Sequence, residues 1–191
     1  MAYKPPVAVY DACVLYPFHL RNLLVQCAVD RLVDARWTDT IHEEWIRSLV
    51  ADDASLSEAK LRRTRNLMNR FLPDANVAGY QRHIDRIRLP DPDDRHVVAA
   101  GIAANASFII TWNAPDSPAR ELAKHGLSRK SPDTLLTDPY SARPDVVLAA
   151  TANARRNLSR SASSASDFLD ALDRQRVHRF VRAMRGHISD L

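Results

Sequence analysis

The sequence predicts an α/β protein whose central parallel sheet carries helices on both faces, with a helical extension at its C-terminal end. Two observations predict the sheet: short apolar runs at residues 7–10 and 108–111 have the length of buried strands, and segments with helical spacing of apolar residues lie between them. Such an alternation is typical of parallel sheets covered by helices. A third observation sets the extension apart, because the formal net charge of +4 arises entirely after residue 140, where the chain holds nine Arg and five Asp.

We therefore expect an α/β domain over residues 1–140 and a basic helical extension over residues 141–191. The apolar content of 46% and the charged content of 26% are ordinary for a globular protein. Cys13 and Cys27 lie in apolar surroundings without metal-binding spacing, which favours reduced core residues. The sequence contains no recognisable signal peptide and no apolar run of about 18 residues, so we expect a cytoplasmic protein without a membrane span.

The first half of the chain predicts the following elements. Residues 7–10 form a strand that ends at Asp11, and residues 18–33 form a helix. Residues 36–37 form a very short strand, and residues 38–50 form a helix that Thr38 or Thr40 caps. An Arg-rich amphipathic helix at 57–72 follows and ends at Pro73, and then come a third short strand at 76–78 and a helix at 80–87.

The second half begins with a helix of small residues at 97–106, which is able to pack closely on the sheet, and a strand at 108–111. A helix at 117–125 ends at Gly126, an edge strand follows at 127–130, and a short helix begins at 132–136. In the extension we expect a helix at 144–158, a flexible polar linker at 159–166 and one basic helix at 167–185. The apolar face of this last helix must dock on the same domain, on a second copy or on a partner chain.

Acidic side chains gather at both ends of one helix–strand unit. Asp91, Asp93 and Asp94 precede the small-residue helix, and Asn113 and Asp116 follow the next strand. Because the chain returns along the strand to the edge from which the helix started, both groups lie on one rim of the sheet. Structural roles are also possible. Each of the three preceding acids is able to cap the small-residue helix, Asp116 is able to cap the helix that begins at residue 117, and Asn113 is able to shape the turn.

Asp11 and Glu44 extend this acidic group from earlier in the chain. Asp11 ends an apolar strand, and Glu44 flanks the buried stripe of its helix, where a carboxylate is able to face a cavity. Together with Asp94 and Asp116 they form four carboxylates whose mutual repulsion a divalent cation would offset. Oxygen ligands suit Mg²⁺ or Mn²⁺, so metal-assisted hydrolysis of phosphodiester bonds is the leading chemistry.

The sequence also offers alternatives to this site and lacks the motifs of other phosphate-binding sites. Glu43 is adjacent to Glu44 and competes with it, and His96 is interpreted as structural because it lies on another face of the helix than Asp94. The chain has no GxGxxG or Walker lysine loop, and a DxD phosphatase pattern after the first strand is interrupted by Cys13.

These segments together resemble the PIN-domain family, the metal-dependent nucleases that include the toxins of VapBC-type toxin–antitoxin pairs. The resemblance covers roughly residues 7–137. It rests on four segments and the side chains within them: VYDACVLYP with Asp11, TDTIHEEWIRSL with Glu44, LPDPDDRHVVAAGIAA with Asp94, and IITWNAPDSP with Thr111, Asn113 and Asp116.

The resemblance implies a three-layer α/β/α sandwich and an endoribonuclease that depends on Mg²⁺ or Mn²⁺. It implies that Asp11, Asp94 and Asp116 hold the metal and that Glu44 completes the catalytic group and helps to position water. Asp91 and Asn113 are the alternatives at the third and fourth positions. A homodimer and a cognate antitoxin that covers the active site are further expectations of the family.

Two alternatives stay open at this point. The chain is either a nuclease that cuts RNA or a non-catalytic module of the same fold that binds RNA or a protein. The extension either grips RNA phosphates through Arg174, Arg179, Arg182 and Arg185, or docks as an amphipathic helix with a solvated basic face.

Overall fold

A four-stranded parallel sheet forms the centre of the molecule in the computed structural model, which describes residues 3–113, 118–158 and 163–191. The strand order is β2-β1-β3-β4, and the strands span Val7–Tyr10 (β1), Asp34–Arg36 (β2), Phe108–Ile110 (β3) and Ser128–Lys130 (β4). Tyr10 pairs with Ile110 across the two central strands, and both are fully buried. The uninterrupted apolar sequence of β1 and β3 follows from this burial on both faces.

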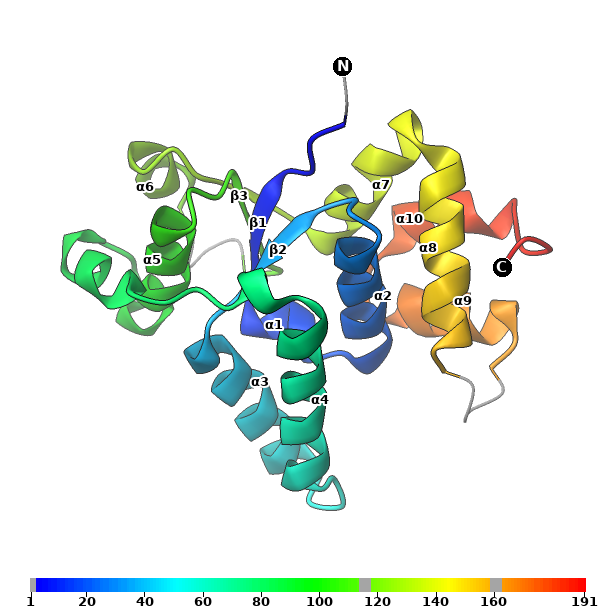
Figure 1. The fold of residues 1–191 in the computed structure, drawn as a ribbon, viewed down its shortest axis with the longest axis horizontal. Coiled ribbons are helices and arrows are strands. Elements are labelled where there is room, and N and C mark those ends of the chain that lie inside the picture. Colours follow the sequence, from blue (N-terminus) through cyan, green and yellow to red (C-terminus); the bar gives the residue numbers. More distant parts are fainter. Residues whose placement is uncertain (1–2, 114–117, 159–162) are drawn as a thin grey trace.

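Helices cover both faces, as the sequence predicts. Helix α2 (Phe18–Val29) lies on one side of the sheet, and α5 (Arg95–Ala103) and α6 (Ala119–Lys124) lie on the other (Figure 1). This arrangement follows from the strand order: the chain leaves β1 towards β2 in one direction and reaches β3 and β4 in the other, and right-handed crossovers then place the connecting helices on opposite faces. The result is a three-layer α/β/α sandwich.

A helical pair, α3 (Asp39–Asp52) and α4 (Glu58–Phe71), lies between β2 and β3 in the chain and projects away from the sheet (Figure 1). Thr38 caps α3 by accepting a hydrogen bond from the backbone N–H of Ile41, so Thr38 and not Thr40 is the cap. The pair is anchored at its base by Trp37 and Trp45, which are both buried.

Four helices form the C-terminal part of the molecule: α7 (Pro132–Ala142), α8 (Pro144–Arg156), α9 (Ala165–Arg174) and α10 (His178–Arg185). They gather beside α2 (Figure 1), and α8 and α9 both contact α2. The apolar face of this part is fully buried, including Phe168 and Phe180. The C-terminal helices therefore dock on the sheet domain of the same chain, which is one of the three docking partners that the sequence allows. The predicted boundary at residues 140/141 falls within α7 and stays a prediction.

Two sequence predictions of regular structure are wrong. Residues 76–78 form no strand: Asn76 makes a single bridge with Trp37, and Gly79, at φ +71°, then turns the chain away. The predicted basic helix at 167–185 is two helices, because the chain reverses at Arg176, whose φ of +70° is incompatible with a continuous helix. The break lets both short helices turn their apolar faces inward, whereas one straight helix would carry its far end past the core.

Other elements differ in length or type. The predicted helix at 18–33 ends at Val29, the helix at 80–87 is a 3₁₀ segment (Tyr80–Arg86), and the short helix at 132 continues to Ala142. Two further 3₁₀ turns, Pro73–Ala75 and Pro92–Asp94, and a short helix α1 (Ala12–Leu15) complete the described elements. Part of the predicted linker, residues 159–162, lies outside the described residues, and Ser164 at its end caps α9 together with Asp167.

Candidate functional site

Asp11 lies at the carboxyl end of β1, at the point of the sheet where the strand order reverses. The chain runs from β1 to β2 on one side, and β3 lies on the other, so the ends of β1 and β3 border the crevice where ligands of open α/β sheets bind. The backbone N–H of Asp11 donates to the Ile110 carbonyl at 3.1 Å, which continues the pairing of the two strands to this point. The sheet therefore holds the Asp11 carboxylate at the mouth of the crevice.

Thr111, at the end of β3, fixes the orientation of that carboxylate. Its hydroxyl donates to Asp11 Oδ2 at 2.6 Å and accepts the backbone N–H of Asn113 at 2.9 Å. Thr111 is buried, so both bonds lie away from bulk water. A single side chain thus joins the first acid to the loop that carries Asn113.

The Cys13 thiol is a second donor to Asp11. The sequence predicts a core residue at this position and gives no sign of this contact. Its Sγ lies 3.1 Å from Asp11 Oδ2 and accepts the backbone N–H of Trp112 at 3.4 Å. Burial, and then the charge of Asp11, raise the pKa of Cys13 to about 12, so the thiol stays protonated and can donate. This role is structural support of the carboxylate rather than nucleophilic chemistry.

Glu44 reaches the site from α3 and is held by His96 from α5. His96 Nε2 lies 2.8 Å from Glu44 Oε1, and the imidazole is buried. The interpretation of His96 as structural is consistent with this contact, yet its partner is an acid of the predicted site. The spacing of His96 from Asp94 gives no signal of this, because Glu44 comes from a different helix.

The neighbouring acid, Glu43, has a different task. Its carboxylate forms ion pairs with Arg62 at 2.7 Å and Arg65 at 2.9 Å on α4. These hydrogen bonds and charges lower the pKa of Glu43. Glu43 therefore ties α3 to α4, which leaves Glu44 as the acid of this helix that faces the site.

The three aspartates before α5 also separate into different roles. Asp91 accepts a hydrogen bond from the backbone N–H of Asp93 at 2.8 Å and caps the 3₁₀ turn that leads into the helix. Asp94 occupies the N-cap position of α5 without a side-chain capping bond. Capping, the structural role considered for these acids, is therefore the role of Asp91. The Asp94 carboxylate makes no capping hydrogen bond.

One hollow of about 380 Å³ collects most of the predicted side chains. We call it the acid pocket; its polar lining includes Asp11, Glu44, Asp93, Asp94 and Asn113. Thr111 supports it through Asp11, and Asp91 is not part of the lining. Asp116 lies outside the described residues, so its predicted place as the fourth acid stays a prediction.

The donor set of the acid pocket suits a hard divalent cation. Four carboxylates and one amide offer oxygen ligands, which Mg²⁺ and Mn²⁺ prefer. Within residues 3–113, 118–158 and 163–191, no three His, Cys, Asp or Glu side chains are already close enough to bind one ion together. The described part of the pocket therefore fits such an ion in chemistry but does not contain a closed ligand cluster.

Comparison with known families identifies both parts of the chain. Residues 7–114 match the family model of a PIN domain, and residues 132–186 match that of a VapC50 C-terminal domain. Together the two matches agree with a VapC-like PIN toxin. No curated protein and no solved structure gives a significant match. Across the described ranges, no helix is both long enough and apolar enough to span a bilayer.

Proposed function

The chain belongs to the PIN-domain family, and from this premise we propose that it is a metal-dependent endoribonuclease that acts as the toxin of a toxin–antitoxin pair. The observation that supports this proposal most strongly is the convergence of Asp11, Glu44 and Asp94 from three separate segments on one pocket at the carboxyl edge of the sheet. A sheet protein without a ligand has no physical reason to collect like charges there. The match of residues 132–186 supports the assignment to toxins and, with it, a cognate antitoxin as partner.

Mg²⁺ or Mn²⁺ would be held by Asp11 and Asp94, with Asp116 as the further ligand expected from the family. When bound, such an ion polarises the scissile phosphate and assists attack by water. The protein supplies the positioning: Thr111 and Cys13 both donate to Asp11 Oδ2 and so fix the orientation of a carboxylate that lines the pocket.

Glu44 has the role of orienting the attacking water. Its Oε1 lies 2.8 Å from His96 Nε2, which fixes the carboxylate, and no partner of Oε2 is found among the described residues, so this oxygen is able to accept from water. An RNA phosphodiester that enters the pocket would then meet carboxylates from α3, from the end of β1 and from the start of α5.

The test compares matched aspartate variants in Mn²⁺-dependent cleavage of a labelled single-stranded RNA. Asp11→Asn and Asp94→Asn should each reduce the cleavage rate by about 100-fold or more, because each removes a charged ligand and leaves its size unchanged. Asp91→Asn is the control, since Asn caps a helix about as well as Asp and Asp91 does not line the pocket. It should cleave within about threefold of the unaltered protein.

Two results would contradict the proposal. Cleavage by Asp11→Asn and Asp94→Asn at the unaltered rate would remove the acid pocket as the active site. The absence of any RNA cleavage by the unaltered protein, together with the absence of Mn²⁺ binding in calorimetry, would favour the non-catalytic module instead.

A further inference from the structure

A second hollow, of about 570 Å³, lies beside the acid pocket, and Tyr16 lines both. We call it the arginine groove; its aromatic lining is Tyr16, Phe18 and Trp112, and its basic lining is the buried Arg21 and the exposed Arg174 and Arg176. Trp112 directly precedes Asn113 of the acid pocket, whereas the two exposed arginines come from the end of α9 and the turn after it. The groove thus lies where the C-terminal helices meet the edge of the sheet that carries the candidate active site.

The arginines of the groove are not used to hold the fold together by ion pairs. Arg174 and Arg176 are exposed, and within the described residues neither has a carboxylate oxygen within 4.0 Å. Arg62 and Arg185, by contrast, are paired with acids of neighbouring helices. The Arg176 guanidinium instead lies 5.1 Å from the centre of the Trp112 ring, in a cation–π contact.

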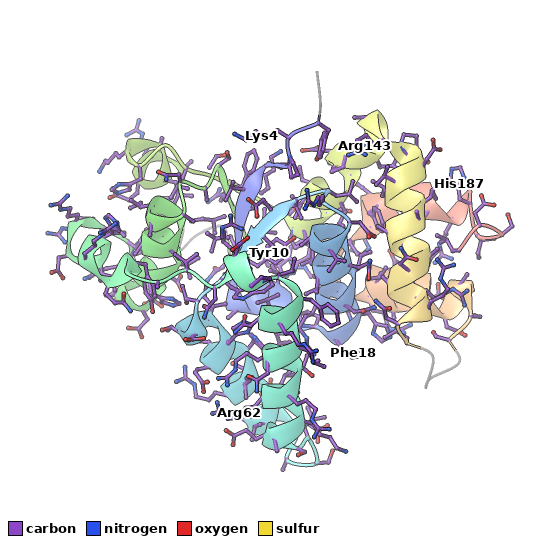
Figure 2. All side chains as sticks on the ribbon, in the orientation of Figure 1. Lys4, Tyr10, Phe18, Arg62, Arg143 and His187 are labelled. Carbon is purple, nitrogen blue, oxygen red and sulfur yellow. The ribbon has the colours of Figure 1, made fainter. Side chains whose placement is uncertain are left out.

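The turn that carries the arginines is fixed to the sheet domain. Gln175, between them, accepts the backbone N–H of Leu20 on α2 at 2.7 Å through its side-chain oxygen. Phe18, two residues earlier in the first turn of α2 (labelled in Figure 2), is 53% exposed and lines the groove. The backbone that carries the two exposed arginines is therefore positioned beside α2 before any ligand binds, which lowers the entropic cost of binding.

The chemistry of this lining suits single-stranded nucleic acid. The described residues of the groove include no Asp or Glu, although the adjoining acid pocket is lined by four of them. Aromatic faces stack on unpaired bases, and guanidinium groups pair with phosphates. We propose that the arginine groove binds the stretch of single-stranded RNA next to the scissile phosphate, with Trp112 and Phe18 against bases and Arg174 and Arg176 against phosphates. This inference rests on the proposed function and assigns to the C-terminal helices a part in substrate binding.

The proposal also revises which arginines of the extension meet RNA. Arg185 is paired with Asp170 at 2.6 Å, and Arg179 and Arg182 are exposed on α10 without lining the groove. Arg174 is the member of the originally expected set that lines the groove, and Arg176 joins it.

The experiment measures binding of a fluorescein-labelled 12-nucleotide single-stranded RNA by anisotropy in EDTA, with a gel to confirm that the RNA stays intact. The groove variant carries Arg174→Gln and Arg176→Gln, and the control variant carries Arg179→Gln and Arg182→Gln, which removes the same charge from α10. The groove variant should bind at least about tenfold more weakly, and the slope of log K against log salt should fall by about 1.4, for two lost phosphate contacts on a single strand. The control should bind within about twofold of the unaltered protein.

Two single variants separate binding from folding. Trp112→Ala should weaken binding by about tenfold through lost stacking. Arg176→Gly should keep or raise the melting temperature, because glycine suits the positive φ at this position, and yet it should weaken RNA binding.

The possible results separate this proposal from the proposed function. Equal losses in the groove and control variants, or unchanged RNA binding by the groove variant, overturn the groove proposal and leave the groove to a protein partner. If the groove variant loses RNA binding while the unaltered protein fails to cut RNA with Mn²⁺, the groove proposal stands and the proposed nuclease function fails. If the unaltered protein cuts RNA and the groove variant cuts equally well at subsaturating RNA, the groove proposal alone fails.

Discussion

Thr111 shows how much of the candidate site depends on one hydroxyl. It donates to the first acid and accepts from the loop that follows β3, so it relates the ends of the two central strands to each other. Valine has the same shape but lacks both bonds, and it would leave Asp11 Oδ2 without its 2.6 Å donor.

We therefore expect Thr111→Val to weaken Mn²⁺ binding by about 10- to 100-fold, the range typical of lost support for metal ligands. Calorimetric titration with Mn²⁺ measures this without reference to activity. Thr111→Ser, which keeps the hydroxyl, is the matched control and should bind within a few-fold of the unaltered protein. Equal affinities for the valine and serine variants would show that Asp11 needs no support from Thr111.

The sequence predicts some site residues better than others for a physical reason. Asp11 was predictable because a charged residue directly after a buried strand has no structural task there. The role of His96 was not predictable, because its partner Glu44 lies on another helix. Cys13 is only two residues from Asp11, but the backbone N–H that its sulfur accepts comes from Trp112, 99 residues away. Local spacing contains no information about such contacts.

At the scale of elements, α3 is anchored to its surroundings through a buried, neutral histidine. His42 accepts the indole N–H of Trp45 at Nδ1, at 3.0 Å, and its Nε2 faces Asn69 Oδ1 of α4 at 3.3 Å. With Nδ1 acting as an acceptor, the proton is on Nε2, and a second proton would face the indole N–H. Burial accordingly lowers the pKa of His42 to about 4.

This histidine should make the stability of the protein depend on pH. The folded-state pKa lies below that of the unfolded chain, so the stabilisation is fully present above about pH 6.5 and is lost as the pH falls towards 4. The free energy of unfolding should fall between pH 7 and pH 4 in the unaltered protein. In His42→Gln this fall should be smaller by about 3 kcal/mol. Urea unfolding at a series of pH values measures the difference.

A substitution that changes no titratable group provides the control for that series. Phe71 is 68% exposed, and Phe71→Ala removes no ionisable side chain, so its unfolding free energy should depend on pH in the same way as that of the unaltered protein. If His42→Gln follows the same pH curve as the unaltered protein, His42 is not the buried neutral group that the hydrogen bonds indicate.

Element types were predictable where one local pattern decides them, and not where a distant contact does. The strands β1 and β3 follow from short apolar runs, whereas the sequence left the cap of α3 open between Thr38 and Thr40, and the structure has Thr38. The order β2-β1-β3-β4 depends on long-range pairing, and so does the position at which the strand order reverses. The break at Arg176 was hidden because an arginine occupies a left-handed position that glycine usually signals.

At the scale of the whole molecule, the C-terminal helices pack directly against α2 of the sheet domain. Phe168 of α9 is fully buried, and its ring lies 6.1 Å from that of His19 on α2. The Asn22 amide of α2 also donates to the Ala154 carbonyl of α8 at 2.6 Å. Apolar contact and hydrogen bonds between the two parts favour a single cooperative unfolding transition.

The three tryptophans make this cooperativity measurable, because Trp37, Trp45 and Trp112 all lie in the part that matches the PIN domain. Phe168→Ala removes a buried ring from the other part and should destabilise the protein by about 3 to 5 kcal/mol. If the parts unfold together, tryptophan fluorescence and far-ultraviolet circular dichroism should report the same lowered midpoint in urea.

Phe71→Ala is the control, because this ring is 68% exposed and its removal should change the unfolding free energy by less than about 1 kcal/mol. A tryptophan midpoint that stays at the unaltered value while the circular dichroism signal shifts would show two independent units. That outcome would also mean that the turn carrying Arg174 and Arg176 is able to leave the sheet domain while the acid pocket stays folded. Coincident midpoints would instead mean that the arginine groove and the acid pocket persist or are lost together.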